Sequence, residues 1–423
     1  MTTPEKLFQE LLGLGDAWVV ERATYAGERG VLELHVKETP QLWEQERCPH
    51  DGGSGVVCHD HVRGLRWRHL NAFAKETEIV CDLPRGKCPA CGKVWRVVPP
   101  WEGQAKHFTR EFEAFALTLM REMPVAKAAE ILGETDTRMW RLLLGYVEEA
   151  YERVDMSEVT CVGVDEMARA KGQRYLSVFA DLLKRRVLFA TPDRDSETWA
   201  AFVEALLRHN GHPHALTHAS MDMSAAYAKG ARENCRNVQI VYDKYHVIAQ
   251  AGEAVDRIRR GEVQGGSAAA RAALSKTRWL WLKNPGGLTA RERRRLRRID
   301  QEMLETGRAY PMRLALQQIY ECGTAAEAAA RFVQWCRWVR READRASRWL
   351  LHHMARVADM IESHLAGILA HWDRRLTNAY LEGLNSVFSA VRRKARGYRT
   401  PRHMIAMLYF VAGKLPAPAT PSH

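Results

Sequence analysis

The chain of 423 residues lacks a long hydrophobic run, and its longest apolar stretch, Met404 to Gly413, is about half of what a membrane-spanning helix needs. Its first residues show no signal-peptide pattern of a basic start followed by an apolar segment. Nine cysteines are too few for a disulfide scaffold. A phosphate-cradling G-x-x-x-x-G-K-[ST] motif is also missing. We therefore expect a cytoplasmic protein with no membrane segment and no nucleotide cofactor.

Acidic residues are scarce in two segments. The chain carries a net charge of +12, and 46% of its residues are hydrophobic, which is enough for globular cores. Residues 257–298 hold thirteen Lys and Arg against two acids, and residues 383–423 hold seven against none, so the remainder is net negative. Solvated helix faces are one explanation. The other explanation is that these side chains bind the phosphate backbone of a nucleic acid, because its negative charge would relieve the repulsion between the like charges in each segment.

Cysteines and histidines gather in the first hundred residues. Cys88-Pro-Ala-Cys91-Gly is a zinc-knuckle pattern, and an earlier Cys48-Pro suggests its partner in a zinc ribbon. Asp51 stands where the second thiolate of the first knuckle is expected. The fourth ligand could come from Asp51 or from a nearby residue (His50, Cys58, His59 or His61), or the metal could have been lost. The other cysteines have no ligand spacing, and we expect them to be buried: Cys81, Cys161, Cys235, Cys322 and Cys336.

Helical spacing begins after this module. Residues 112–120 fit one apolar face, Val125 to Leu132 form a second helix, and Thr135 or Asp136 can cap a third. This order is typical of a helix-turn-helix, with Arg138 and Arg141 on the exposed face of the last helix. An ordinary three-helix connector is the alternative.

Residues 159–241 read as a meander of three strands (159–165, 175–181 and 186–191) followed by α/β units. A helix (197–207), a strand (215–221), a helix (224–234) and a last strand (238–241) follow. This is the order of a ribonuclease-H-like core. Residues 246–378 look almost wholly helical, and residues 379–396 form a further helix ended by Gly397.

Carboxylates stand at the ends of two of these strands. Asp165 ends one and Asp222 the other, and neighbouring strand ends can lie side by side at one edge of a sheet. Two facing carboxylates repel each other unless divalent cations bridge them. A third candidate ligand for such cations is Glu382, on the helix predicted at residues 379–396. For Asp165 and Asp222, which follow apolar strands, the alternative is that each caps a loop. Asp243 and His246 could support the site, or could be a helix cap and a surface histidine.

Ordered motifs along the chain resemble the DDE transposases of bacterial insertion sequences, specifically the ISL-three family. The resemblance covers residues 40–415 and rests on this ordered set: Trp67-Arg-His-Leu70, Cys88-Pro-x-Cys-Gly, Pro100-Trp101, Arg121-Glu-Met-Pro-Val125, Asp165-Glu166, Met221-Asp-Met-Ser-x-x-Tyr227-x-x-Gly230, Asp243-x-x-His246, Trp281-Leu-Lys-Asn-Pro285, Leu376-Thr-Asn-x-x-Leu-Glu382-Gly-Leu-Asn385 and Arg396-Gly-Tyr-Arg399.

The resemblance implies an α/β ribonuclease-H-like catalytic core with a large all-α insertion, preceded by a zinc-ribbon-like module and a helix-turn-helix. The expected segments are the zinc-ribbon-like module (1–103), the helix-turn-helix region (104–155), the first part of the core (156–250), the insertion (251–375), the last core helix (376–415) and a tail (416–423).

The same resemblance implies a catalytic triad of Asp165, Asp222 and Glu382. These residues would hold two Mg²⁺ or Mn²⁺ ions, which can activate a water and stabilise the leaving oxygen in phosphodiester cleavage. Glu166, Asp243 and His246 would lie behind these metal ligands and orient them. Cys48, Cys88, Cys91 and Asp51 would hold Zn²⁺. The expected reaction is cleavage at the ends of an insertion sequence, followed by attack of the freed 3′-OH on target DNA.

The implied partner is double-stranded DNA, as terminal inverted repeats and as target, in a nucleoid-associated bacterial protein that is at least a dimer. The DNA-binding candidates are Arg138, Arg141, Arg293, Arg294, Arg297, Arg392, Arg393, Lys394, Arg396 and Arg399. Trp279 and Trp281 could stack on a flipped base or belong to a helical core. Two other classes stay open: a structure-specific nuclease of the same fold and a catalytically inactive DNA-binding regulator.

Overall fold

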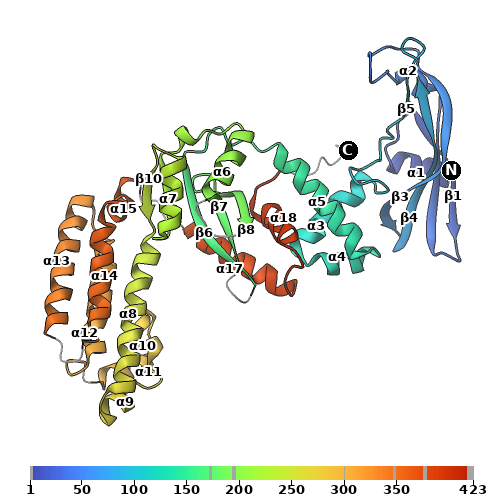
Figure 1. Ribbon diagram of the computed structural model, residues 1–423. Helices are drawn as coiled ribbons and strands as arrows, with labels where there is room; N and C mark the ends of the chain where they lie inside the picture. Colours follow the sequence, from blue (N-terminus) through green and yellow to red (C-terminus); the bar gives the residue numbers. More distant parts are fainter. Residues whose placement is uncertain are drawn as a thin grey trace. The chain divides into compact units, whose positions relative to one another are not determined.

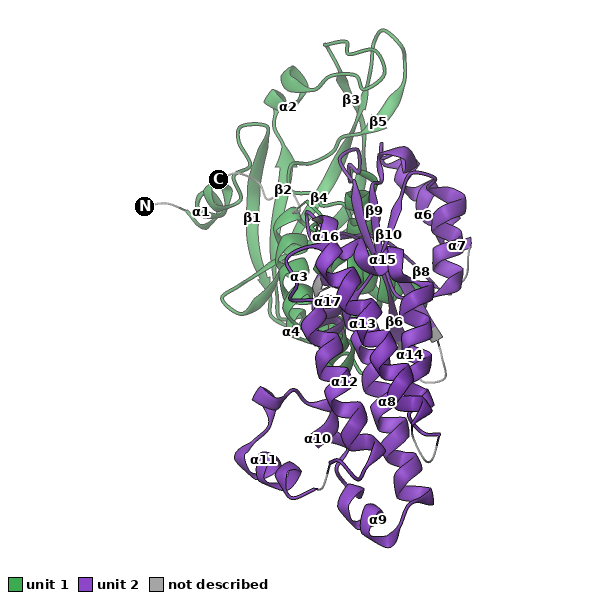
Figure 2. Cartoon of the chain, turned by 90° about the vertical axis from the view of Figure 1, so that its left-hand side faces the viewer, with its two compact units in different colours: residues 1–153, 389–423 green, residues 154–388 purple. Residues whose placement is uncertain are grey.

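The computed structural model describes residues 3–170, 174–192, 197–299, 301–345, 349–374 and 379–416. It divides into two compact units, residues 1–153 with 389–423 and residues 154–388 (Figure 2). The finer boundaries expected from the sequence stay a prediction. Residues 376–378 of the expected motif around Glu382, and the tail from residue 417, lie outside the described residues. Among the described helices, none is long and apolar enough to cross a membrane.

The first unit begins with a five-stranded sheet in the order β1-β2-β4-β3, with β5 also paired to β4 (Figure 1). β2 runs parallel to β4 and the other pairs are antiparallel. Its elements are α1 (Pro4–Leu11), β1 (Trp18–Ala26), β2 (Val31–Glu38), α2 (Pro40–Gln45), β3 (Val57–Ala72), β4 (Lys75–Lys87) and β5 (Val94–Arg96). The alternating apolar residues at 31–36 and the short β-like runs at 78–81 and 94–98 predict strands, and they lie in β2, β4 and β5; no sequence pattern predicts β1 or the long β3. Trp18, Trp67 and Trp101 form the centre of its core.

Three helices follow: α3 (Arg110–Glu122), α4 (Val125–Leu132) and α5 (Asp136–Glu152). Thr109 and Thr135 begin α3 and α5, because each hydroxyl accepts a hydrogen bond from a backbone N–H of the first turn. The expected cap at Thr135 is confirmed. In the same unit, α18 (Pro401–Ala412) packs against α5, where the rings of Tyr146 and Phe410 lie 5.8 Å apart.

The second unit is built on a sheet in the order β10-β9-β6-β7-β8. β6, β7 and β8 form the expected antiparallel meander, and β9 and β10 add to the other side of β6 as parallel strands. The bounds are β6 (Cys161–Ala170), β7 (Arg174–Asp181), β8 (Arg186–Pro192), β9 (His218–Met221) and β10 (Gln239–Tyr242). The strand expected from residue 215 begins only at His218, since η1 (Pro213–Ala215) is a single 3₁₀ turn. Helices α6 (Glu197–Arg208) and α7 (Ala225–Asn234) connect the strands.

The rest of this unit is helical, as expected, and α8, α12, α13 and α14 pack side by side (Figure 1). Buried Glu262 of α8 joins two of these helices, because its carboxylate accepts hydrogen bonds from the backbone N–H groups of Glu305 and Thr306. The elements are α8 (Lys244–Gly265), α9 (Ala268–Leu274), α10 (Arg278–Leu282), η2 (Pro285–Gly287), α11 (Ala290–Arg297), α12 (Glu305–Ile319), α13 (Ala325–Asp344), α14 (His352–Ser363), α15 (Leu365–Leu369), α16 (His371–Arg374) and α17 (Ala379–Lys394). The boundary between the two units falls inside α17.

Candidate functional sites

Two matching turns bring the N-terminal cysteines together. In the first, Gly52 donates its N–H to the carbonyl of Cys48, and in the second Gly92 donates to the carbonyl of Cys88. Both glycines have a left-handed backbone, with φ of 71° and 70°, which few other residues adopt without strain. Each turn also aims a backbone N–H at its first sulfur: that of His50 at Cys48 and that of Cys91 at Cys88. Asp51 and Cys91 thus occupy equivalent places in the two turns.

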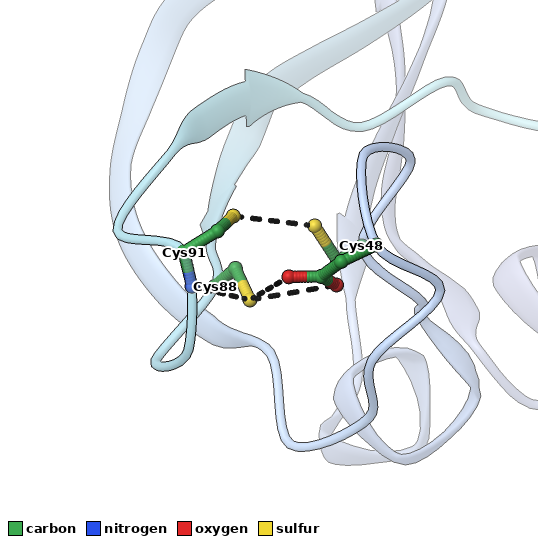
Figure 3. A group of neighbouring side chains, drawn as sticks. Cys48, Cys88 and Cys91 are labelled. Atoms are coloured by element: carbon green, nitrogen blue, oxygen red, sulfur yellow. Dashed lines mark hydrogen bonds between the residues drawn. The ribbon is translucent and has the colours of Figure 1, made fainter.

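One ligand atom from each of Cys48, Asp51, Cys88 and Cys91 lies within 4.8 Å of the other three. Figure 3 shows the three cysteines of this group close together. The sulfurs of Cys48 and Cys91 are 3.7 Å apart, and the sulfur of Cys88 is 3.5 Å from Oδ2 of Asp51. A tetrahedral zinc ion with Zn–S bonds of about 2.3 Å requires sulfurs about 3.8 Å apart. The spacing therefore fits zinc, and Asp51 supplies the fourth donor of the predicted set.

Hydrogen bonds favour the ionised forms of two of these donors. The Gly53 N–H donates to Asp51 and, with smaller contributions from the cysteines, lowers the pKa of that carboxyl to about 2. The backbone N–H of Cys91 lowers the pKa of the Cys88 thiol. Metal ligands must be deprotonated to bind, so these turns prepare both groups for a cation. The spacing brings neither Cys58 nor His61 into this cluster.

The two strand carboxylates lie on neighbouring parallel strands. The last paired residues of β6 and β9 are Gly163 and Ser220, and Asp165 and Asp222 each come two residues later. Asp165 was expected at the end of its strand, and that expectation is wrong. β6 continues to Ala170 because its other edge still pairs with β7, where Asp165 lies opposite Val178. Asp222 follows the end of β9 directly, as expected.

Asp165 is held on both carboxylate oxygens. Its Oδ1 accepts the backbone N–H of Glu166 at 2.7 Å, and its Oδ2 accepts the side-chain amide of Asn385 at 2.7 Å. Asn385 lies one helical turn after Glu382 on α17, so this hydrogen bond links the helix of Glu382 to β6. The sequence motif contained Asn385, but no role was inferred for it. Its spacing of three residues from Glu382 is the sequence feature that could have indicated a role in the same site.

Negative charge accumulates around this position. Burial raises the pKa of Asp165, and Asp222 and Asp243 add to the shift, while His246 opposes it. Burial and the charge of Asp243 likewise raise the pKa of Glu382. The oxygens of Asp165, Asp222 and Glu382 do not, among the described residues, form a group within 4.8 Å of one another. These side chains are thus close enough to affect one another's pKa, but their oxygens lie farther apart than the ligand atoms of the N-terminal cluster.

Asp243 serves as the cap of α8, because its Oδ1 accepts the N–H of Tyr245. Its Oδ2 is buried and has no hydrogen-bond donor among the described residues. An unpaired buried carboxylate oxygen is costly unless a cation or a proton satisfies it. The donor set of this region therefore fits a hard divalent cation, which prefers carboxylate oxygens.

The DNA-binding candidates lie in three places. Arg141 is exposed on α5, whereas Arg138 is partly engaged by Glu134 and by the ring of Phe108. Arg141, Lys394 and Arg399 line one hollow of about 750 Å³ in the first unit, so two distant segments of the chain meet there. Of the other candidates in the second segment, Arg392 and Arg393 lie in the last turn of α17, and Arg396 comes two residues after its end. Arg293, Arg294 and Arg297 are exposed on α11.

The two tryptophans of the insertion differ in exposure. Trp281 is fully buried and its Nε1 donates to Thr277, which agrees with the helical-core alternative and excludes stacking on a base. Trp279 is 61% exposed, with the Arg278 guanidinium over its ring. The five cysteines without ligand spacing are buried, as expected.

Comparison with known proteins identifies the class. A family model described as a transposase, of the DDE type, matches residues 162–408, which is more than half of the chain. The helix-turn-helix domain of transposase family ISL3 matches residues 100–147. The zinc finger of the transposases of IS204, IS1001, IS1096 and IS1165 matches residues 44–91.

Two relatives that match over nearly their whole length are also transposases. The transposase for insertion sequence element IS1001 of Bordetella parapertussis is 26% identical over 403 residues, covering 93% of this chain and 95% of the relative. The transposase for IS1557 of Mycobacterium tuberculosis is 26% identical over 445 residues, covering 97% and 96%. These matches place the chain among the DDE transposases. It belongs to their ISL3 family, which confirms the resemblance inferred from its motifs. Membership suggests DNA as partner and the use of divalent metal, and the N-terminal cluster suggests zinc.

We expect Asp51→Ala to weaken zinc binding by about 100-fold, because about 10–16 kcal/mol shared among four ligands is about 3 kcal/mol for each. Asp51→Cys should retain the metal, since it restores a thiolate at the same place in the turn. The measurement is competition with a chelator. His50→Ala, a change to the exposed neighbour, is the matched control and should behave as the unaltered protein does. Equal retention by Asp51→Ala would remove Asp51 from the ligand set.

Proposed function

We propose that this protein is a transposase that binds the terminal inverted repeats of an insertion sequence, cleaves DNA at the element ends and joins the freed 3′-OH to target DNA. The observation that carries the proposal is the placement of Asp165 and Asp222 at the same level of two neighbouring strands. The hydrogen bond from Asn385 brings the helix of Glu382 to the same carboxylate.

The order of the sheet supports a ribonuclease-H-like core. Three antiparallel strands, β6, β7 and β8, come first along the chain, and β9 and β10 then add in parallel beside β6. The helical segment after β10 separates this sheet from Glu382. The proposed segmentation is therefore the one expected from the sequence, with a core interrupted by an all-helical insertion.

The carboxylates of Asp165, Asp222 and Glu382 would hold two Mg²⁺ or Mn²⁺ ions. Such ions, when bound, favour ionisation of the attacking water or 3′-OH and stabilise the charge on the leaving oxygen. Asp165 would be the central ligand, because it lies among the other acidic groups and both of its oxygens are fixed. Asp222 and Glu382 would complete the individual sites.

The neighbouring residues orient these ligands. The N–H of Glu166 and the amide of Asn385 fix the plane of the Asp165 carboxylate. His246 offsets the negative charge of Asp165 and Glu382, and Asp243 adds to it. No side chain is assigned as a nucleophile, because water and then a DNA 3′-OH perform the two attacks. Since one phosphodiester replaces another in the joining step, no nucleotide cofactor is required.

The basic segments would hold DNA near the reacting phosphate, while the zinc-binding module and the helix-turn-helix read the inverted repeats. Part of the positive charge in residues 257–298 is neutralised within the protein: Asp256 pairs with Arg259, Arg260 and Arg278. The arginines of α11 are more available, since Arg293 and Arg297 have no acidic partner among the described residues. Two element ends must be brought together, so we propose a dimer or larger assembly on DNA.

Asp165→Ala, Asp222→Ala and Glu382→Ala should each lower Mg²⁺-dependent nicking of inverted-repeat DNA by about 10³-fold. The loss of a metal ligand removes several kcal/mol of transition-state stabilisation, and about 1.4 kcal/mol is worth tenfold in rate. Glu158→Ala, at an exposed acid that pairs with Lys184, is the control and should leave the rate unchanged.

The same substrates separate this function from its two rivals. Joining of the cleaved 3′-OH to a second duplex supports a transposase, and cleavage without joining would indicate a structure-specific nuclease. Binding of inverted repeats with no metal-dependent cleavage would indicate an inactive regulator, and either of the last two results would overturn the proposal.

Asn385→Ala should weaken Mn²⁺ binding by about 10–100-fold, as expected for loss of a group that orients a metal ligand. Binding can be measured by calorimetry without any DNA, so the result does not depend on activity. Ser386→Ala, an exposed position on the same helix, is the control. Unchanged Mn²⁺ affinity in Asn385→Ala would mean that the hydrogen bond to Asp165 has no positioning role.

Replacing both Arg293 and Arg297 with Ala should weaken DNA binding equally for inverted-repeat and unrelated sequences. If each arginine contacts one phosphate, the slope of log affinity against log salt should decrease in magnitude by about 2. Arg331→Ala, an exposed arginine paired with Glu327 on α13, is the control. A slope that does not change would remove α11 from the DNA-contacting surface.

A further inference from the structure

A second group of potential metal ligands lies on the N-terminal sheet, outside the Cys48 cluster. It consists of Glu38 at the end of β2 and of Cys58 and His61 near the start of β3. One ligand atom from each residue lies within 4.8 Å of the other two. A thiol, an imidazole and a carboxylate together are the donor types that bind zinc and related ions.

A bulge in β3 brings two of these residues to one face. In a regular strand, residues three apart point to opposite faces. Here Cys58 lies opposite Gly86 and His61 opposite Pro84, which are two residues apart on β4 and therefore share a face. The extra residue between Cys58 and Asp60 causes this shift. The irregularity of the strand thus creates the spacing that a metal site needs.

Glu38 completes the group from the far side of β4. Its Oε1 lies 2.6 Å from Nε2 of His61, so the two side chains are already oriented toward each other. Glu38 and His61 line a surface hollow of about 690 Å³, which gives solvent and ions access.

We propose that Glu38, Cys58 and His61 form a second metal site that binds Zn²⁺ or a similar borderline divalent transition ion. Tetrahedral bonds of about 2.0–2.3 Å place neighbouring ligand atoms about 3.3–3.6 Å apart. The ion would replace the direct contact between Glu38 and His61, with side-chain shifts of less than about 1.5 Å. Three protein ligands leave the fourth position for water.

This site is separate from the Cys48 cluster. That cluster already has four donors, which fill a tetrahedral ion. Cys58 and His61 were candidates for its fourth ligand in the sequence, and the structure gives that place to Asp51. The two residues therefore have no role in the first site.

The test is the zinc content of the purified full-length protein after dialysis against a zinc buffer. The unaltered protein should retain two equivalents, and Cys58→Ser and Glu38→Gln should each retain one. His59→Ala is the matched control, because His59 lies in the same bulge, is exposed and is not among the ligands. It should retain two equivalents. A single equivalent in the unaltered protein, or no loss in either ligand variant, would overturn the proposal.

A cobalt titration gives a second measurement that does not rely on zinc counting. Co²⁺ bound to a cysteine thiolate has a charge-transfer absorption band. The variant with Cys88→Ser and Cys91→Ser disables the first cluster, and it should still show this band with one equivalent of Co²⁺. Adding Cys58→Ser should abolish the band. A band that survives this last substitution would show that Cys58 is not a ligand.

Discussion

The pairing of β6 with β9 is the constraint on which the candidate catalytic site depends. Only three residue pairs define it, from Cys161 and His218 to Gly163 and Ser220. A slip of one residue would turn every side chain of β9 to the opposite face, so Asp222 would no longer lie level with Asp165. Val162 and Ala219 are completely buried beside this pairing. Core packing therefore fixes the register, and the register places the acids.

Much of this architecture was predictable from local signals. The helix Val125–Leu132 and the cap at Thr135 follow from side-chain periodicity and capping, which act within one turn. β3 was missed because three register shifts interrupt the alternation of its side chains. The role of Asn385 was missed for a different reason. Its partner is 220 residues away, and no local pattern reports such a contact.

The N-terminal module shows how backbone geometry can outweigh residue identity. Both knuckles keep the same turn with a left-handed glycine, although one carries Asp51 where the other carries Cys91. The sequence alone left the fourth ligand open because it gives residue types without turn geometry. The bulge in β3 acts in a similar way, since it changes which side chains share a face. In both places a deviation from regular structure positions the donor atoms.

The hydrogen bond between Asp165 and Asn385 also has a consequence for biosynthesis. At about 5–20 residues per second, the ribosome needs about 10–45 s to add the 220 residues between them. Once Tyr242 has been added, the nascent chain contains the whole β6–β10 sheet but still lacks α17. A chain released early by a premature stop in the insertion would keep the N-terminal cysteine module and the helix-turn-helix without the proposed catalytic glutamate. If those two parts bind inverted repeats as proposed, such a fragment would occupy the repeats without cutting them and would compete with the full-length protein for element ends.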